Sequence, residues 1–410
     1  MLVICALSLV AGLMFKGRCS NPESNAFRDL CYNDIQALYG VREIDGRVFP
    51  YVHGTLRDGE LANGAIEYPV LTGVFMWGAG LFAEDYRTYL QATAILLTPF
   101  GLLAAYLLGR MSGRRALLYA AAPAITLYAF HNWDLLVVAA TVGGLWAWSR
   151  GRHLGAAALF GVGAALKMYP ALFLLPLALH RLRAGDRRGA LLTLGAGAGT
   201  FVAINLPFAI ANFDGWWATY EFHRARLPNF DTVWLLGLHP NGDSFSAEAL
   251  NLLTTGLILV SFVAALVYGW RRSVRRNEDY PFLQVCGAAL VAFLLWNKVH
   301  SPQYTLWLLP FFVVVRAHIG WWIAYSVADL AVYVGIFRWF YDFGLSGDFE
   351  ETSPSKWLLM GGIWARALLL AALFVVFLRA RSGLRDGPDH TNVSHPSPSV
   401  RPVGTEPVPS

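Results

Sequence analysis

A short polar segment near the N-terminus carries the residue best suited to acid–base chemistry. Asp34 follows Tyr32 and Asn33 and precedes an apolar helical pattern that begins near Ile35. A carboxylate held beside a bound acceptor hydroxyl can take its proton, so Asp34 is a candidate general base. The alternative role is structural, because Asp is also a favoured N-terminal cap of a helix.

A second polar segment separates two apolar stretches and reads Trp-Asn-Lys-Val-His-Ser-Pro-Gln-Tyr over residues 296–304. Such a run is unusual for a short turn between apolar helices. Lys298 and His300 are candidates to bind a phosphate, and His300 could equally hold Asp34 or a sugar. The alternative places the Lys298 ammonium at the lipid headgroups and His300 in solvent. Gln303 and Tyr304 are candidates for sugar or acceptor binding.

A third candidate is a lysine inside a long apolar run. Lys167 lies three residues before Pro170, which is expected to end the helix that precedes it. Two half-length helices that meet there would point the lysine into a cavity, where its point charge suits a phosphate. The alternative is a lysine that reaches the headgroup layer.

Further polar groups are weaker candidates. The guanidinium groups of Arg224 and Arg226 would suit a phosphate, and a second set would suit sugar or acceptor hydroxyls. Loops of any membrane protein contain such residues, so an ordinary solvated role stays open for them. The second set comprises Asp134, Asn132, Glu67 and Tyr68.

The composition defines the elements that must position these residues. Of the 410 residues, 56% are hydrophobic and only 14% are charged, against about 25% charged in soluble domains. These values exclude a disordered chain, a disulfide-rich secreted scaffold and an ordinary soluble enzyme. We therefore expect an all-α polytopic membrane protein. Its net charge of +5 is expected to come from basic cytoplasmic loops, with no nucleic-acid partner.

Apolar runs long enough to cross a bilayer, or to form half-crossings that end in a cavity, recur along the chain. They predict about twelve transmembrane helices, at 2–15, 88–109, 116–130, 134–149, 154–166, 170–180, 190–211, 250–270, 281–297, 303–316, 321–338 and 357–378.

The charge distribution predicts the orientation. One set of connections, including the C-terminal tail, holds 18 basic residues and six acidic ones, whereas the other set holds 20 of the 27 acids. Basic loops stay in the cytoplasm, so both termini should be cytoplasmic and the large loop 16–87 extracytoplasmic. This alternation requires that 69–83 form a helix at the outer surface. A true short crossing there is the alternative, and it would invert everything downstream.

The two ends of the chain and the cysteines complete the expected layout. We expect 2–15 to be a retained helix, with a start that lies upstream of Met1. Residues 1–381 should form one transmembrane domain, and the Pro-rich tail 382–410 should be disordered in the cytoplasm. Cys19 and Cys31 both lie in the large outer loop, where a disulfide can persist. Cys5 and Cys286 lie within crossings.

Several segments resemble the GT-C membrane glycosyltransferases, and glycosyltransferase family 87 in particular. The similarity rests on 30–35, on Val-Phe-Pro-Tyr at 48–51, on Glu-Tyr-Pro-Val-Leu at 67–71, on 167–170 and on 298–304. By position, Asp34 matches the catalytic acid that this family carries in its first outer loop. The resemblance implies a GT-C fold, a polyprenyl-phosphate sugar donor, with mannose as the expected sugar, and inversion at the transferred carbon. The acceptor would be a lipid-linked compound or a glycan.

The resemblance also sets the expectation for cofactors. Some relatives carry a D-x-D pair where this chain has the single Asp34, so no metal requirement carries over and no cofactor is expected.

Three other functions compete with this interpretation. A polyprenyl-phosphate pentose such as arabinose could serve as the donor on the same scaffold, and an inactive scaffolding subunit would keep the fold alone. A twelve-helix transporter or lipid flippase would fit the number of crossings. The sequence shows no matching halves, however, and its polar residues gather on the outer side, whereas alternating access favours a site near the midplane.

Overall fold

The computed structural model describes residues 1–21, 23–241, 245–350 and 352–384. Most of the expected disordered tail, residues 385–410, lies outside the described residues. The described chain is helical apart from two small antiparallel pairs of strands. The strand pairs are β1 (Thr55–Arg57) with β2 (Glu60–Ala62), and β3 (Val315–Arg316) with β4 (Arg381–Ser382).

Among the described residues, six helical segments are long and apolar enough to cross a membrane. Leucine, isoleucine and valine side chains lie exposed along several of them, as on α10 and α12. Such exposure suits a lipid environment and would be costly in water. The chain is therefore a multi-pass membrane protein. The segments are Leu2–Ser20 with α1 (Leu2–Gly17), Tyr86–Ala120 with α4 (Tyr86–Ser112), α10 (Arg187–Ala211), α12 (Ala247–Arg276), α15 (Ile319–Ser346) and α16 (Pro354–Arg379).

The remaining predicted crossings correspond to shorter elements, so twelve crossings are not shown. The expected helix 116–130 is divided, because Pro123 lacks a backbone N–H and starts a new helix. The expected helix 170–180 begins as a tighter turn at Pro170. The short elements are η2 (Gly113–Ala116), α5 (Leu117–Ala120), α6 (Pro123–Tyr128), α7 (Asp134–Ser149), α8 (His153–Leu166), η3 (Tyr169–Phe173), α9 (Leu174–Arg183), α13 (Phe282–Trp296), η5 (Pro302–Tyr304) and α14 (Thr305–Val314).

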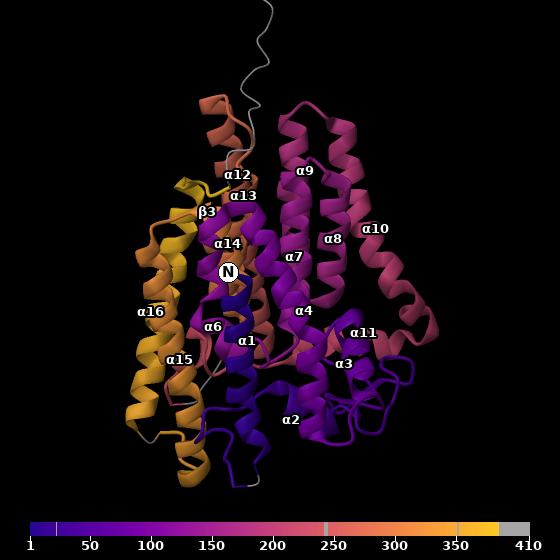
Figure 1. Cartoon of the computed structure of the whole chain (residues 1–410), viewed down its shortest axis with the longest axis vertical. Coiled ribbons are helices and arrows are strands. Elements are labelled where there is room, and N and C mark those ends of the chain that lie inside the picture. The colour runs from indigo at the N-terminus through magenta and orange to yellow at the C-terminus, as the bar shows by residue number, and fades with distance from the viewer. Residues whose placement is uncertain (22, 242–244, 351, 385–410) are drawn as a thin grey trace, which may run out of the picture.

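The Arg-rich connections gather at one end of the helical bundle, the upper end in Figure 1. Arg115 donates to the carbonyls of Phe312, Val313 and Val315, at the end of α14. Arg272 donates to two carbonyls at the end of α16. The last carbonyls of a helix have no partner within it, so these guanidinium groups cap the helices and hold the connections together.

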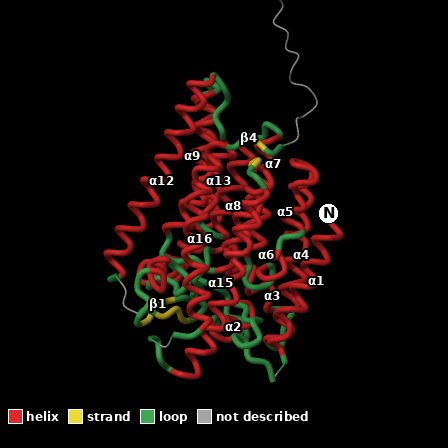
Figure 2. Tube along the Cα trace, turned by 90° about the vertical axis from the view of Figure 1, so that its left-hand side faces the viewer, coloured by secondary structure: helices red, strands yellow, loops and turns green. Residues whose placement is uncertain are grey.

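The elements of the large loop gather at the opposite end, the lower end in Figures 1 and 2. They are held to α11 by side-chain bonds to backbone carbonyls: Asn212 donates to Gly54 at 2.9 Å and Thr219 to Ile66 at 2.7 Å. The large-loop elements are α2 (Asp34–Val41), β1, β2 and α3 (Val70–Gly80), whereas α11 (Phe213–Ala225) and the short helical turn η4 (Val233–Gly237) belong to the connection between α10 and α12.

Helix α3 is the segment that had to remain on one side of the membrane. It has 11 residues, which is about half the length of a crossing. It packs against α4 and α8, and Thr72 Oγ1 donates to the carbonyl of Leu166 at 2.7 Å. Its length agrees with a helix that does not cross, as the charge alternation requires.

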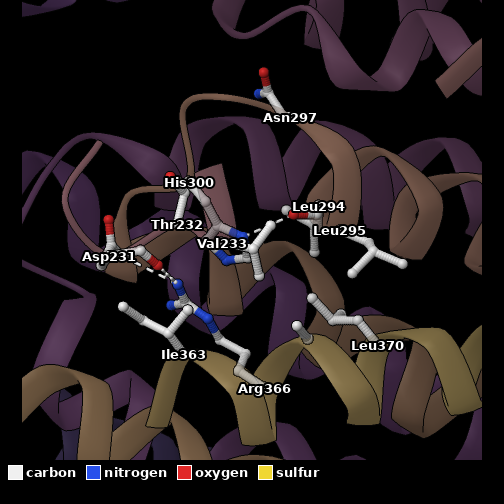
Figure 3. A pocket seen from close by; sticks show the side chains of 11 residues that line it. Asp231, Thr232, Val233, Leu294, Leu295, Asn297, His300, Ile363, Arg366 and Leu370 are labelled. Carbon is white, nitrogen blue, oxygen red and sulfur yellow. Dashed lines mark hydrogen bonds and ion pairs between the residues drawn. The ribbon is translucent and has the colours of Figure 1, made fainter. Parts of the chain in front are cut away.

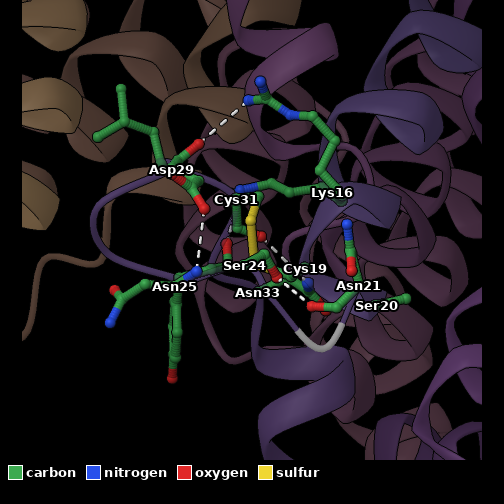
Figure 4. The surroundings of a disulfide bond; sticks show 12 residues. Lys16, Cys19, Ser20, Asn21, Ser24, Asn25, Asp29, Cys31 and Asn33 are labelled. Atoms are coloured by element: carbon green, nitrogen blue, oxygen red, sulfur yellow. Dashed lines mark hydrogen bonds between the residues drawn. A yellow bond between two sulfur atoms is a disulfide. The ribbon is translucent and has the colours of Figure 1, made fainter.

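A disulfide joins Cys19 to Cys31, with their Cα atoms 5.6 Å apart (Figure 4). It ties the end of α1 to the segment that runs directly into α2. The other two cysteines, Cys5 and Cys286, are free and buried.

The disulfide predicts a labelling pattern. Unfolding the native protein in detergent without reductant should expose two thiols to an alkylating reagent, those of Cys5 and Cys286, whereas prior reduction should expose all four. The double variant Cys19→Ser with Cys31→Ser should lose about 3 kcal/mol of stability, because the cross-link restricts the unfolded chain. Four labelled thiols before reduction would contradict the bond.

Candidate active site

A cavity of about 410 Å³ opens at the end of the bundle that carries the large loop. Five separate parts of the chain form its wall, so it exists only once the helices have packed. It is lined by Tyr32 and Asp34, by His131, by residues 226–231, by residues 301–303, and by Ile336, Phe337 and Phe340 of α15.

Asp34 is the first residue of α2, and it does not cap that helix. The cap is Asn33, whose side chain accepts a hydrogen bond from the backbone N–H of Gln36 at 2.9 Å. The backbone N–H of Asp34 donates to the carbonyl of His131 at 2.8 Å. The capping interpretation of Asp34 was therefore wrong, and its carboxylate lines the cavity.

Neutral donors hold the Asp34 carboxylate. Asn132 Nδ2 donates to Asp34 Oδ2 at 2.8 Å, and Gln303 Nε2 lies 3.5 Å from the same oxygen. Asn132 also donates to the Tyr68 hydroxyl at 2.7 Å. Burial raises the pKa of Asp34 above its ordinary value, although the Asn132 bond and the Lys167 charge oppose the rise.

Lys167 forms a buried ion pair beside the cavity. Its ammonium lies 3.0 Å from Asp134 Oδ1, and Trp307 Nε1 donates to that oxygen at 2.6 Å. The ammonium also lies 5.0–5.5 Å from the ring centres of Tyr68, Tyr304 and Trp307. The headgroup interpretation of Lys167 was wrong, because its side chain is 8% exposed. Asp134 neutralises it and does not itself line the cavity.

Arg224, within α11, and Arg226, which directly follows α11, have different environments. Arg224 is 73% exposed and pairs with Glu221 at 2.7 Å, so it points away from the cavity. Arg226 lines the cavity that contains Asp34. None of the ion pairs among the described residues includes Arg226.

Lys298 and His300 serve other partners. The Lys298 ammonium donates to the carbonyls of Arg224 and Arg226 at 3.1 and 2.6 Å, where α11 ends. His300 is buried, and its Nδ1 lies 2.8 Å from the carbonyl of Leu294. It faces a small pocket that it shares with Arg366 (Figure 3). Neither residue lines the cavity with Asp34. The alternative that placed His300 in solvent was wrong, because its side chain is buried.

Two buried ion pairs were missed in the sequence. Arg366 of α16 pairs with Asp231 at 3.2 Å (Figure 3), and Arg42 of the large loop pairs with Glu67 at 2.6 Å. An arginine within an apolar crossing requires a partner, so the position of Arg366 in the sequence could have predicted a buried ion pair. Asp231 reaches the wall of the cavity, whereas the Glu67 carboxylate is occupied by Arg42.

Comparison with known proteins identifies the family of this chain. The family model of glycosyltransferase family 87 matches residues 67–296, which is more than half of the chain. The chain belongs to glycosyltransferase family 87. This confirms the resemblance seen in the sequence and makes the chain a member of a GT-C family. The matched residues of family 87 include Lys167, Arg226 and Asp231, whereas Asp34 and residues 298–304 lie outside them.

The curated relatives of this family 87 member are distant. A polyprenol-phosphate-mannose-dependent alpha-(1-2)-phosphatidylinositol mannoside mannosyltransferase of Mycobacterium tuberculosis is 31% identical over 250 residues, 57% of this chain and 52% of the relative. The protein of that name from Mycolicibacterium smegmatis is 27% identical over 269 residues, 60% and 56% of the two chains. The match thus spans about half the length of each.

A eukaryotic protein also matches. The catalytic subunit of GPI alpha-1,4-mannosyltransferase I of Danio rerio is 29% identical over 180 residues, 40% of this chain and 43% of the relative.

The buried pair of Lys167 and Asp134 predicts a large stability effect. Lys167→Ala leaves the Asp134 carboxylate buried without a cation, and we expect it to destabilise the protein by about 3–5 kcal/mol. Thermal unfolding in detergent measures this. Arg224→Ala is the matched control, because it breaks only the exposed pair with Glu221 and should leave Tm unchanged. Equal losses in the two variants would contradict the assignment.

Proposed function

We propose that the chain is an integral membrane mannosyltransferase. It moves mannose from a polyprenyl-phosphate carrier to a lipid-linked or glycan acceptor at the extracytoplasmic face, with inversion. The observation that carries the proposal is one cavity that holds a carboxylate, Asp34, and a cation, Arg226, neither engaged in an ion pair among the described residues. To transfer a sugar from a sugar phosphate, an enzyme needs a base for the acceptor hydroxyl and a cation that binds the phosphate.

The proposed step is a single displacement. The acceptor hydroxyl oxygen attacks the anomeric carbon, and the bond from that carbon to the phosphate oxygen breaks. Asp34 takes the hydroxyl proton. The electron pair of the broken bond leaves on polyprenyl phosphate, and the Arg226 guanidinium stabilises the developing negative charge.

The remaining walls of the cavity suit the rest of the donor. Ile336, Phe337 and Phe340 offer an apolar surface on α15 to the first units of the polyprenyl chain. We propose that Gln303 and Tyr32, which line the cavity with Asp34, bind sugar hydroxyls. We propose that Asn132 and Tyr68 act through Asp34, because Asn132 Nδ2 donates to the Asp34 carboxylate and to the Tyr68 hydroxyl.

Lys167, Asp134, Tyr304 and Glu67 support this site from outside the cavity. Lys167 and Tyr304 belong to the cluster around Asp134, and Glu67 holds Arg42. We assign the donor phosphate to Arg226 rather than to the other four candidates, which are Lys167, Lys298, His300 and Arg224.

The layout in the membrane is part of the proposal. We propose that the described helices make about twelve crossings and half-crossings, with both termini in the cytoplasm of a bacterial cell and the cavity facing outward across the plasma membrane. The grouping of the Arg-rich connections at the end opposite the cavity supports this orientation.

Asp34→Asn tests the base. In nanodiscs supplied with polyprenyl-phosphate mannose and phosphatidylinositol mannoside, we expect kcat/KM to fall by roughly 10²–10⁴-fold, because the hydroxyl loses its proton acceptor. Burial raises the pKa of Asp34, and the base acts when ionised. The wild-type rate should therefore fall with decreasing pH at a midpoint above about 4, the ordinary value for Asp.

Two results would count against this function. Full turnover by Asp34→Asn would remove Asp34 as the base. A higher kcat/KM with polyprenyl-phosphate arabinose than with the mannose donor would show that the enzyme transfers a pentose.

Arg226→Gln tests the phosphate ligand, with Arg224→Gln as its control. The first variant removes the cation in the cavity, and we expect KM for the donor to rise roughly tenfold or more, as for the loss of a charge-assisted bond. The second removes an exposed arginine two residues away and should leave KM unchanged. A rise of similar size in both would place the donor outside the cavity.

A further inference from the structure

Lys16 is a buried lysine at the end of an apolar helix. It lies in the last turn of α1, and its relative exposure is 0%. A charged group in such a position is costly unless its N–H bonds are all satisfied. Its surroundings, which include the Cys19–Cys31 disulfide (Figure 4), must therefore be built to receive it.

The ammonium has three N–H bonds and three acceptors. They are the carbonyl of Tyr32 at 2.7 Å, the hydroxyl of Tyr333 at 2.9 Å and His131 Nδ1 at 3.1 Å. The Tyr333 hydroxyl can accept this bond because it donates its own proton to the carbonyl of Leu30 at 2.5 Å. His131 accepts in the tautomer that carries its proton on Nε2.

Two of these acceptors belong to the segments that hold Asp34. Tyr32 precedes Asp34 by two residues, and His131 supplies the carbonyl that accepts the Asp34 backbone N–H. Lys16 thus links both supports of Asp34 to α1 and, through Tyr333, to α15. The disulfide anchors the same segment one residue before Tyr32.

Lys16 also differs from Lys167 in its partners. Lys167 forms an ion pair with Asp134, whereas the three partners of Lys16 are neutral groups. Lys16 therefore acts on the two supports of Asp34 through its hydrogen bonds.

We propose that Lys16 is a positioning residue for Asp34, because it holds in place the two segments that orient the Asp34 carboxylate. The inference rests on the proposed function only in taking Asp34 as the base. Beside Tyr32 and Tyr68, the charged or titratable groups around Asp34 are Glu67, His131, Lys167, Arg226 and Asp231. The substitution of Lys16 leaves the identity of each of these groups unchanged.

An infrared titration of the full chain in nanodiscs tests the positioning directly. Subtracting the spectra of Asp34→Asn isolates the Asp34 carboxyl band, and its midpoint is then compared between wild type and Lys16→Met. We expect the midpoint to rise by roughly one pH unit in Lys16→Met, because the release of His131 disturbs the hydrogen bond that the adjacent Asn132 donates to the ionised carboxylate.

The control is Lys356→Met. Lys356 is also a buried lysine, donates to a backbone carbonyl (that of Phe349, at 2.6 Å) and lies 5.4 Å from an aromatic ring centre, but it lies on α16 and does not line the cavity. It should leave the Asp34 midpoint unchanged. An unchanged midpoint in folded Lys16→Met, or an equal shift in Lys356→Met, overturns the proposal.

Tyr333→Phe tests the positioning and keeps the inference falsifiable if Lys16→Met does not fold. It removes the hydroxyl that links Lys16 to Leu30 but retains the lysine charge. We expect kcat to fall roughly tenfold with an unchanged donor KM, since small displacements of a base slow the chemical step. An unchanged kcat would overturn the positioning role. A wild-type protein that transfers no sugar would contradict the proposed function, whereas the infrared midpoint would still decide the effect of Lys16 on Asp34.

Discussion

The buried charged side chains at the cavity end of the bundle share one constraint, which is that the surrounding protein and lipid solvate ions poorly. The cost of an unpaired buried charge is several kcal/mol, so each such residue must find a partner as the helices pack. Lys167 meets Asp134, Arg366 meets Asp231, and Arg42 meets Glu67. Each pair joins elements that are distant in the chain, and together they position the walls of the cavity.

Helix ends impose a related constraint. The last carbonyls of a helix lack partners, and in a membrane protein water is not everywhere at hand to supply them. Arg115 and Arg272 cap α14 and α16 at the Arg-rich end, and Lys298 caps α11 at the cavity end. Lys298 thereby fixes the direction of the chain as it leaves α11, which is where Arg226 turns into the cavity.

Two charged residues of the cavity wall stay outside this pairing, and they define the candidate chemistry. Among the ion pairs of the described residues, neither Asp34 nor Arg226 takes part. Both line the same cavity, opposite an apolar face of α15. An enzyme that transfers a sugar from a lipid phosphate needs such an arrangement, because its base must stay available and its cation must remain open to the phosphate.

The sequence by itself determined the class of protein, the family and the ends at which polar residues gather, because hydropathy, charge position and local motifs are properties of short segments. It also placed Asp34 and the two outer-loop cysteines correctly in one segment. It could not decide which cations face the cavity. The residues Lys298, Lys167 and Arg226 look alike in the sequence alone. In the structure, backbone carbonyls at the end of α11 bind the first, a carboxylate of α7 neutralises the second, and of the three only Arg226 lines the cavity with Asp34. Only the tertiary structure decided this, because the partner of a buried charge is chosen by the packing of elements far apart in the chain.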